Sequence, residues 1–131
     1  MLRRVLLPTL AVTLAWVVLD FFLHVLLLGE QYRATPALWR PTGEMKMGVM
    51  YFAVFIAALA FTAIWHKFVR PKNGPTGLLY GVWFGLGHGI SMGYGSYAVM
   101  PLTYVIALAW FLGSIVEGAA AGMIVAALVK E

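Results

Sequence analysis

Four ionisable side chains lie within long apolar stretches of the sequence: Asp20, His24, His88 and Glu117. Asp20 and His24 are four residues apart, so on a helix they share one face. Ionisable groups inside a membrane span are costly and are typical of functional sites. Carboxylates and imidazoles at that depth can pass protons or hold a cation, so these four residues form the main candidate site.

Other chemistry is compatible with the same residues. The side chains could simply hydrogen-bond across helices, with the carboxyl groups protonated or paired with histidine. His24 and His88 could ligate haem b, but their predicted depths differ by about 10 Å, which suits a single iron poorly. Asp20, His24 and Glu117 are ligand types for zinc, iron or manganese. Since no motif favours haem or a metal ion, no cofactor is predicted and the identity of any metal stays unknown.

The surrounding composition predicts an integral membrane protein. The chain has 131 residues, of which 63% are hydrophobic and 11% charged, whereas soluble domains carry about 25% charged residues. Apolar stretches of about 20 residues predict membrane-spanning helices. The sequence predicts an all-α, single-domain bundle over residues 1–131, with spans at about 5–28, 47–65, 77–99 and 102–128 and an outer loop at 29–46.

The basic residues predict how this bundle is oriented, because lysine and arginine are enriched on the cytoplasmic side. With the N-terminus inside, six basic residues lie on the inner side and three on the outer side. Both termini are therefore predicted to be cytoplasmic, in a multi-pass membrane protein. The first span resembles a signal peptide, but its length and its polar residues favour a retained anchor. Because the basic residues lie at helix ends rather than in one patch, nucleic acid is not a predicted partner.

Glycine recurs at every fourth position of the third predicted span. The series is Gly77, Gly81, Gly85, Gly89 and Gly93, and the fourth span carries a matching series of Ser114, Gly118 and Gly122. Small residues at this spacing let two helices approach closely in lipid. The pattern predicts a glycine zipper between the third and fourth helices, although the same stripe could form a contact between two copies of the chain.

The outer loop is the most polar segment and contains Tyr32, Arg33, Trp39 and Arg40. Its aromatic residues suit the membrane interface, so we expect an amphipathic cap, with a ligand-binding lid as the alternative. Thr35 followed by Pro36 could begin a short helix. We also expect the methionines at 45, 47 and 50 to pack as ordinary apolar side chains rather than to bind Cu(I).

Several stretches resemble a set of small bacterial inner-membrane proteins that carry no assigned function. The resemblance rests on "LDFFLHVLLLGEQYRATPALWRP", "EMKMGVMY", "GISMGYGSYAVMP" and "LAWFLGSIVEG". It covers nearly the whole chain and implies a four-helix membrane protein, without an activity or a substrate.

The sequence contains no arrangement for nucleophilic catalysis, so the leading prediction is a non-enzymatic role. The chain would lie in the lipid bilayer as a homo-oligomer or as an accessory subunit of a membrane complex. The first alternative is a small transporter or channel that is coupled to protons or cations through the intramembrane polar residues. The second alternative is an electron-transfer subunit that binds haem or a metal.

Overall fold

The computed structural model of the chain describes residues 2–131, of which the side chains from Arg3 onward are described. The protein is all-helical, with 85% helix and no strand among these residues. In chain order the elements are α1 (Leu2–Asp20), the π-helix η1 (Phe21–Leu27), α2 (Gly29–Ala34), the 3₁₀ turns η2 (Pro36–Leu38) and η3 (Thr42–Glu44), α3 (Met47–Phe68), α4 (Gly74–Gly89), the π-helix η4 (Ile90–Gly95), α5 (Ser96–Val99) and α6 (Tyr104–Leu128).

Three helical stretches are long and apolar enough to cross a membrane: Arg3–Leu27, Met47–Phe68 and Tyr104–Leu128. At a rise of 1.5 Å per residue, the 22 residues of α3 extend for roughly 33 Å, close to the thickness of a hydrocarbon core. At most a third of the most apolar part of each stretch is buried, so most of its apolar side chains face outward. Outward-facing apolar helices of this length suggest a membrane protein. The stretch from α4 to α5 is not among the three, because its glycines and His88 lower its hydropathy.

The helix ends differ by a few residues from the predicted ones, and side-chain capping accounts for two of the differences. The Asn73 side chain accepts a hydrogen bond from the Thr76 N–H at 2.9 Å, so α4 begins at Gly74. Thr103 accepts from the Ile106 N–H at 3.3 Å, so α6 begins at Tyr104. The helix expected after Thr35 is only the 3₁₀ turn η2, in which the Trp39 indole, instead of a backbone N–H, donates to the Thr35 hydroxyl.

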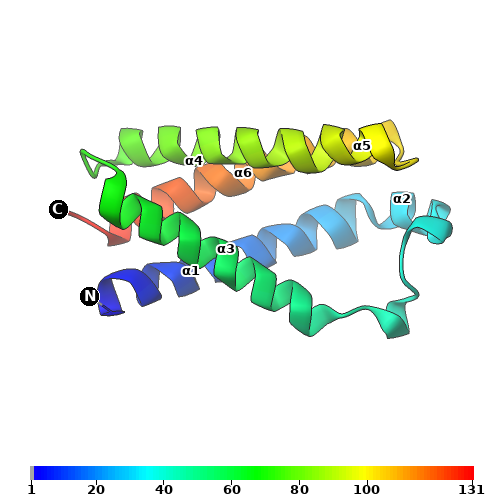
Figure 1. Cartoon of the computed structure of the whole chain (residues 1–131), viewed down its shortest axis with the longest axis horizontal. Coiled ribbons are helices and arrows are strands. Elements are labelled where there is room, and N and C mark those ends of the chain that lie inside the picture. Colours follow the sequence, from blue (N-terminus) through cyan, green and yellow to red (C-terminus); the bar gives the residue numbers. More distant parts are fainter. Residues whose placement is uncertain (1) are drawn as a thin grey trace.

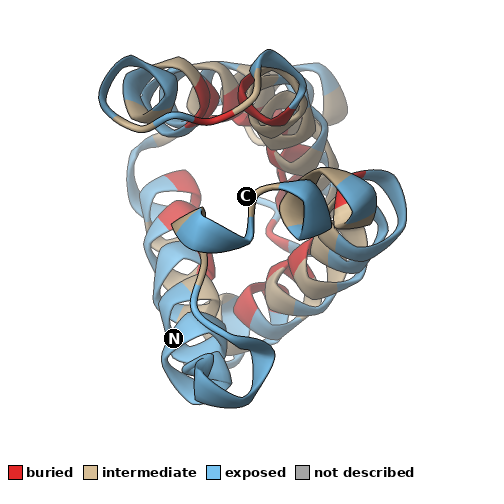
Figure 2. Cartoon of the chain, turned by 90° about the vertical axis from the view of Figure 1, so that its right-hand side faces the viewer, coloured by how far each residue is buried: buried red, intermediate tan, exposed pale blue. Residues whose placement is uncertain are grey.

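The four long helical segments form a bundle in which each packs against its neighbours. α6 lies against α4 on one side and against α1 on the other, and α3 crosses α1 (Figure 1). Viewed from the end that carries α2, the buried residues lie on the faces that the helices turn toward one another (Figure 2). Both ends of the chain lie at the end of the bundle where α3 connects to α4 (Figure 1).

The glycine series that runs along α4 and η4 lies against α6. All five members of the series are buried, from Gly77 to Gly93. A Cβ atom added to Gly81 would collide with the backbone carbonyl of Gly118, and one added to Gly85 would collide with that of Ser114. The reverse holds as well, because a Cβ at Gly118 would strike the Gly81 carbonyl oxygen. The two backbones therefore approach more closely than any larger residue at these positions would permit.

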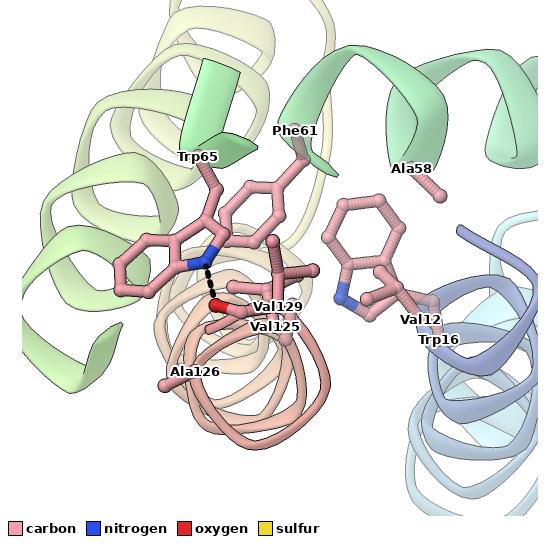
Figure 3. Packing of buried hydrophobic residues seen from close by; sticks show 9 residues of the cluster. Val12, Trp16, Ala58, Phe61, Trp65, Val125, Ala126 and Val129 are labelled. Carbon is pink, nitrogen blue, oxygen red and sulfur yellow. Dashed lines mark hydrogen bonds between the residues drawn. The ribbon is translucent and has the colours of Figure 1, made fainter. Parts of the chain in front are cut away.

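An aromatic core fills the half of the bundle near the chain ends. Figure 3 shows Trp16 from α1, Phe61 and Trp65 from α3, and Val125 from α6 packed together. The buried polar atoms of the aromatic rings bond to backbone carbonyl groups. The Trp65 indole donates to the Val129 carbonyl at 3.3 Å (Figure 3), and the Tyr80 hydroxyl donates to the Phe61 carbonyl at 2.8 Å. These bonds tie α3 to α4 and to the end of α6.

We expect Gly81→Ala to destabilise the protein by about 1–3 kcal/mol, because the added methyl group forces α4 away from α6. Gly87→Ala is the matched control, since an added Cβ there meets no atom within 4 Å. The control should be neutral or gain up to about 1 kcal/mol from its better helix propensity. Thermal unfolding in detergent compares the two variants, and equal melting temperatures would contradict the described packing.

Candidate functional site

A cavity of about 410 Å³ lies between α1, α3, α4 and α6 and brings together three of the four predicted polar residues. Asp20 enters it from the end of α1, His88 from α4 and Glu117 from α6. Asp20 and Glu117 are half-buried, whereas His88 is exposed. Met50 and Val54 of α3 form the remaining wall. The site therefore needs all four long helical segments.

The close approach of α4 and α6 explains why His88 and Glu117 meet. His88 directly precedes Gly89 of the glycine series, and Glu117 directly precedes Gly118 of the facing series. One residue corresponds to about 100° of rotation on a helix, so each side chain lies on the face next to the packed stripe. Gly85 is packed against Ser114, and Gly81 against Gly118. The α4 face that carries His88 and the α6 face that carries Glu117 therefore both line the same cavity.

The carboxyl groups of Asp20 and Glu117 lie next to each other in this cavity. The Oε1 atom of Glu117 is buried and has no hydrogen-bond partner among residues 2–131. The Trp16 indole bonds to the backbone carbonyl of Glu117 at 2.9 Å, so it holds this part of α6 without neutralising the side chain. Two adjacent carboxylates in apolar surroundings repel each other, so the pair needs a shared proton or a bound cation.

A chain of polar contacts leads from Asp20 to the outer loop. The Nε2 atom of His24 is 3.6 Å from Asp20 Oδ1, and its Nδ1 atom is hydrogen-bonded to the Tyr32 hydroxyl. The Trp110 indole, which can only donate, bonds to the same hydroxyl at 2.8 Å. The Tyr32 hydroxyl therefore links His24 of η1 to Trp110 of α6.

The outer-loop residues line a second cavity of about 660 Å³. Tyr32, Arg33, Trp39 and Arg40, which the sequence suggested as an outer cap, all contribute to its walls. His24 lines this outer cavity rather than the one that holds Asp20, and Met50 lines both. Over residues 2–131, neither Arg33 nor Arg40 makes an ion pair.

The helical segments that carry His24 and His88 each change to π-helical geometry beside a polar residue. η1 follows Asp20 directly and contains His24, and η4 begins two residues after His88. π-helical turns are rare in proteins overall, but those that occur are often at functional sites. Nothing in the sequence reveals them, because a π turn and an α turn accept the same residue types.

The residues suggested as haem or metal ligands do not all line one cavity. Within the described part of the chain, no group of three histidine or acidic side chains is arranged to hold a metal ion. The two histidines proposed for haem line different cavities. The carboxyl pair and its neighbouring imidazoles are instead suited to exchanging protons.

Sequence reasoning missed several residues that surround the site. Phe84 and Met92 lie four residues before and after His88 and line the same cavity. That helical spacing is a signal that could have identified both side chains. Met50 was expected only to pack, yet it lines both cavities. Trp110 gave no signal because its partner Tyr32 is distant in the sequence.

No protein family, no curated protein and no solved structure matches the chain. The resemblance noted from the sequence therefore stays a prediction, and the geometry of the two cavities is the basis for inferring a function.

Tyr32→Phe should weaken the outer half of the bundle by about 1–2 kcal/mol, because Trp110 and His24 both lose a partner. Burial raises the pKa of Tyr32 from 10.0 to about 12. Its hydroxyl therefore stabilises the fold fully below pH 10, and this contribution is lost as the pH rises through 12. We expect the stability difference between wild type and variant to shrink over that range.

The matched control is Tyr51→Phe, whose hydroxyl is on an exposed residue of α3 and makes no hydrogen bond within residues 2–131. Unfolding at several pH values measures both variants. A constant difference between wild type and Tyr32→Phe from pH 9 to 12 would contradict the buried, hydrogen-bonded tyrosine.

Proposed function

We propose that the chain is a four-span membrane protein whose two ends lie on the cytoplasmic side of a bacterial inner membrane. The fourth span would be the continuous helical segment formed by α4, η4 and α5, with 16, 6 and 4 residues. That length is sufficient to cross a hydrocarbon core of about 30 Å. The five glycines of the series carry little apolar surface, but they are covered by α6 and need no lipid contact.

The distribution of basic residues supports this orientation. Six of them belong to the end of the bundle that carries both chain ends and the connection from α3 to α4: Arg3, Arg4, Lys67, Arg70, Lys72 and Lys130. The opposite end has three, Arg33, Arg40 and Lys46. An excess of lysine and arginine is typical of the cytoplasmic side.

Within this protein, the function that the geometry supports best is binding and passage of a proton or a cation at the carboxyl pair. The observation that carries the proposal is the 410 Å³ cavity in which Asp20 and Glu117 adjoin, with Glu117 Oε1 buried and unpartnered over residues 2–131. Such a pair is costly in a membrane unless it binds positive charge. A purely structural carboxyl group would be expected to bond fully to its neighbours.

The contacts beyond Asp20 provide a route for the proton to the outer side. Asp20 contacts Nε2 of His24, and the Tyr32 hydroxyl is hydrogen-bonded to Nδ1. A proton taken up at one ring nitrogen can therefore be released from the other. Tyr32 lines the outer cavity and so connects this series of polar contacts to the outer surface. Histidine side chains serve as proton shuttles in this way.

The test is proton flux into liposomes that contain the purified protein, followed with a pH-sensitive dye inside the vesicles. We expect Glu117→Gln and Asp20→Asn to reduce flux at least tenfold, because each removes one carboxyl group of the pair. Glu44→Gln is the control, since Glu44 is exposed in η3 and lines neither cavity. Wild-type flux no greater than that of protein-free liposomes, with the protein folded, would overturn passage across the membrane.

Binding is tested separately by infrared difference spectroscopy of the carboxyl stretch. We expect a protonated carboxyl band in the wild type that titrates with pH and that shifts or disappears in Glu117→Gln and in Asp20→Asn. A carboxyl band that neither variant changes would show that the pair holds no exchangeable proton.

A role as a homo-oligomer or as an accessory subunit stays a prediction. The glycine stripe faces α6 within one chain, so it is not free to bind a second copy, and an oligomer would need another surface. Native mass spectrometry of gently extracted protein distinguishes the cases: a fixed multiple of the chain mass supports self-association, and a co-purifying protein supports the subunit role.

A further inference from the structure

The intramembrane cavity is lined by acidic groups and lacks cationic ones. Asp20 and Glu117 contribute two carboxyl groups, and His88 is the only other ionisable residue of the lining. The arginines of the protein's outer half line the outer cavity instead. A ligand of this inner cavity therefore gains most if it carries positive charge.

The size of the cavity indicates a ligand larger than a bare ion. Its volume of about 410 Å³ falls in the range of pockets that hold small organic molecules, roughly 300–1,000 Å³. A metal ion held directly by protein would need several converging ligands, and no such group of three exists among the described side chains. Volume and ligand count together favour an organic cation.

One wall of the cavity is a stack of aromatic rings. The Trp16 and Phe84 rings are 6.3 Å apart with an interplanar angle of 14°, and Phe84 and His88 repeat the same arrangement. Aromatic faces attract ammonium groups, tryptophan most strongly, and this attraction grows when water is excluded. Met50 and Met92 add thioether groups that adapt to ligands of different shapes.

We propose that this cavity binds a small organic ammonium ion that carries an apolar or aromatic substituent. The carboxyl pair would balance its charge, and the Trp16–Phe84 wall would contact its substituents. The proposal rests on the proposed function, because the same two carboxyl groups hold the proton when no ammonium ion is bound. It specifies the class of cation that the site accepts.

The experiment compares two probes of the same shape, benzyltrimethylammonium and its neutral carbon isostere neopentylbenzene. Binding is measured by equilibrium dialysis against the wild-type protein in nanodiscs, after subtraction of the probe taken up by empty nanodiscs. We expect saturable binding of the ammonium probe, at least about tenfold tighter than any binding of the neutral probe. This comparison uses only the wild-type chain, so a misfolded variant cannot confuse it.

Variants then locate the binding site. Glu117→Gln and Asp20→Asn should each weaken ammonium binding at least about tenfold, and Trp16→Phe should weaken it by a smaller factor because phenylalanine is the poorer cation–π partner. Glu44→Gln should leave the affinity unchanged. Near-UV circular dichroism of the tryptophans confirms that each variant is folded, and equal binding of both probes by the wild type would overturn the proposal.

The infrared titration described above separates this proposal from the function on which it rests. A carboxyl band that titrates, together with no saturable ammonium binding, means that the site handles protons and that the ammonium proposal is wrong. Loss of both signals means that both proposals fail. Saturable binding of Mg²⁺ or Zn²⁺ in the same dialysis experiment, with none of the ammonium probe, would instead assign the cavity to a metal ion.

Discussion

The close approach of the α4 and α6 backbones is the constraint on which the rest of this structure depends. Between Gly77 and Gly93 each glycine of the series meets the α6 backbone with no room for a side chain. Such an interface has almost no freedom to slide or rotate, because a shift of one residue would bring a large side chain into the gap. It therefore fixes which faces of α4 and α6 remain free, and the polar residues His88 and Glu117 lie on those faces.

The polar residues connect the inner cavity to the outer loop. Asp20 reaches Glu117 from a third helix, and the π-helical segment that follows carries His24 toward the outer loop. From there Tyr32 and Trp110 continue the contacts to the aromatic cluster beneath the loop. An inner acidic cavity and an outer cavity with two arginines are thus joined by one line of side chains. The acidic side chains lie in one cavity and the arginines of the outer loop in the other.

Much of this arrangement could be predicted from residue types and spacing. Apolar stretches of sufficient length indicate helices that suit a bilayer, and they indicate no other fold. Asp20, His24, His88 and Glu117 stand out because ionisable groups are expensive in such stretches, so they could be selected without any knowledge of packing. The glycine and small-residue series on two consecutive helices also predicted which helix faces pack together, since a repeat of four residues defines one side of a helix.

The sequence by itself therefore determined the helices, their approximate ends and the identity of the polar residues, because each of these follows from local composition and period. Only the tertiary structure decided that Asp20, His88 and Glu117 share one cavity while His24 lines another, because that outcome depends on the rotation of four helices about their axes. The glycine stripe faces α6 in the same chain, a choice that spacing cannot make, since a flat face suits any close partner. The aromatic wall and the link from Tyr32 to Trp110 could not be predicted from the sequence either, because contacts between residues far apart in sequence leave no local pattern.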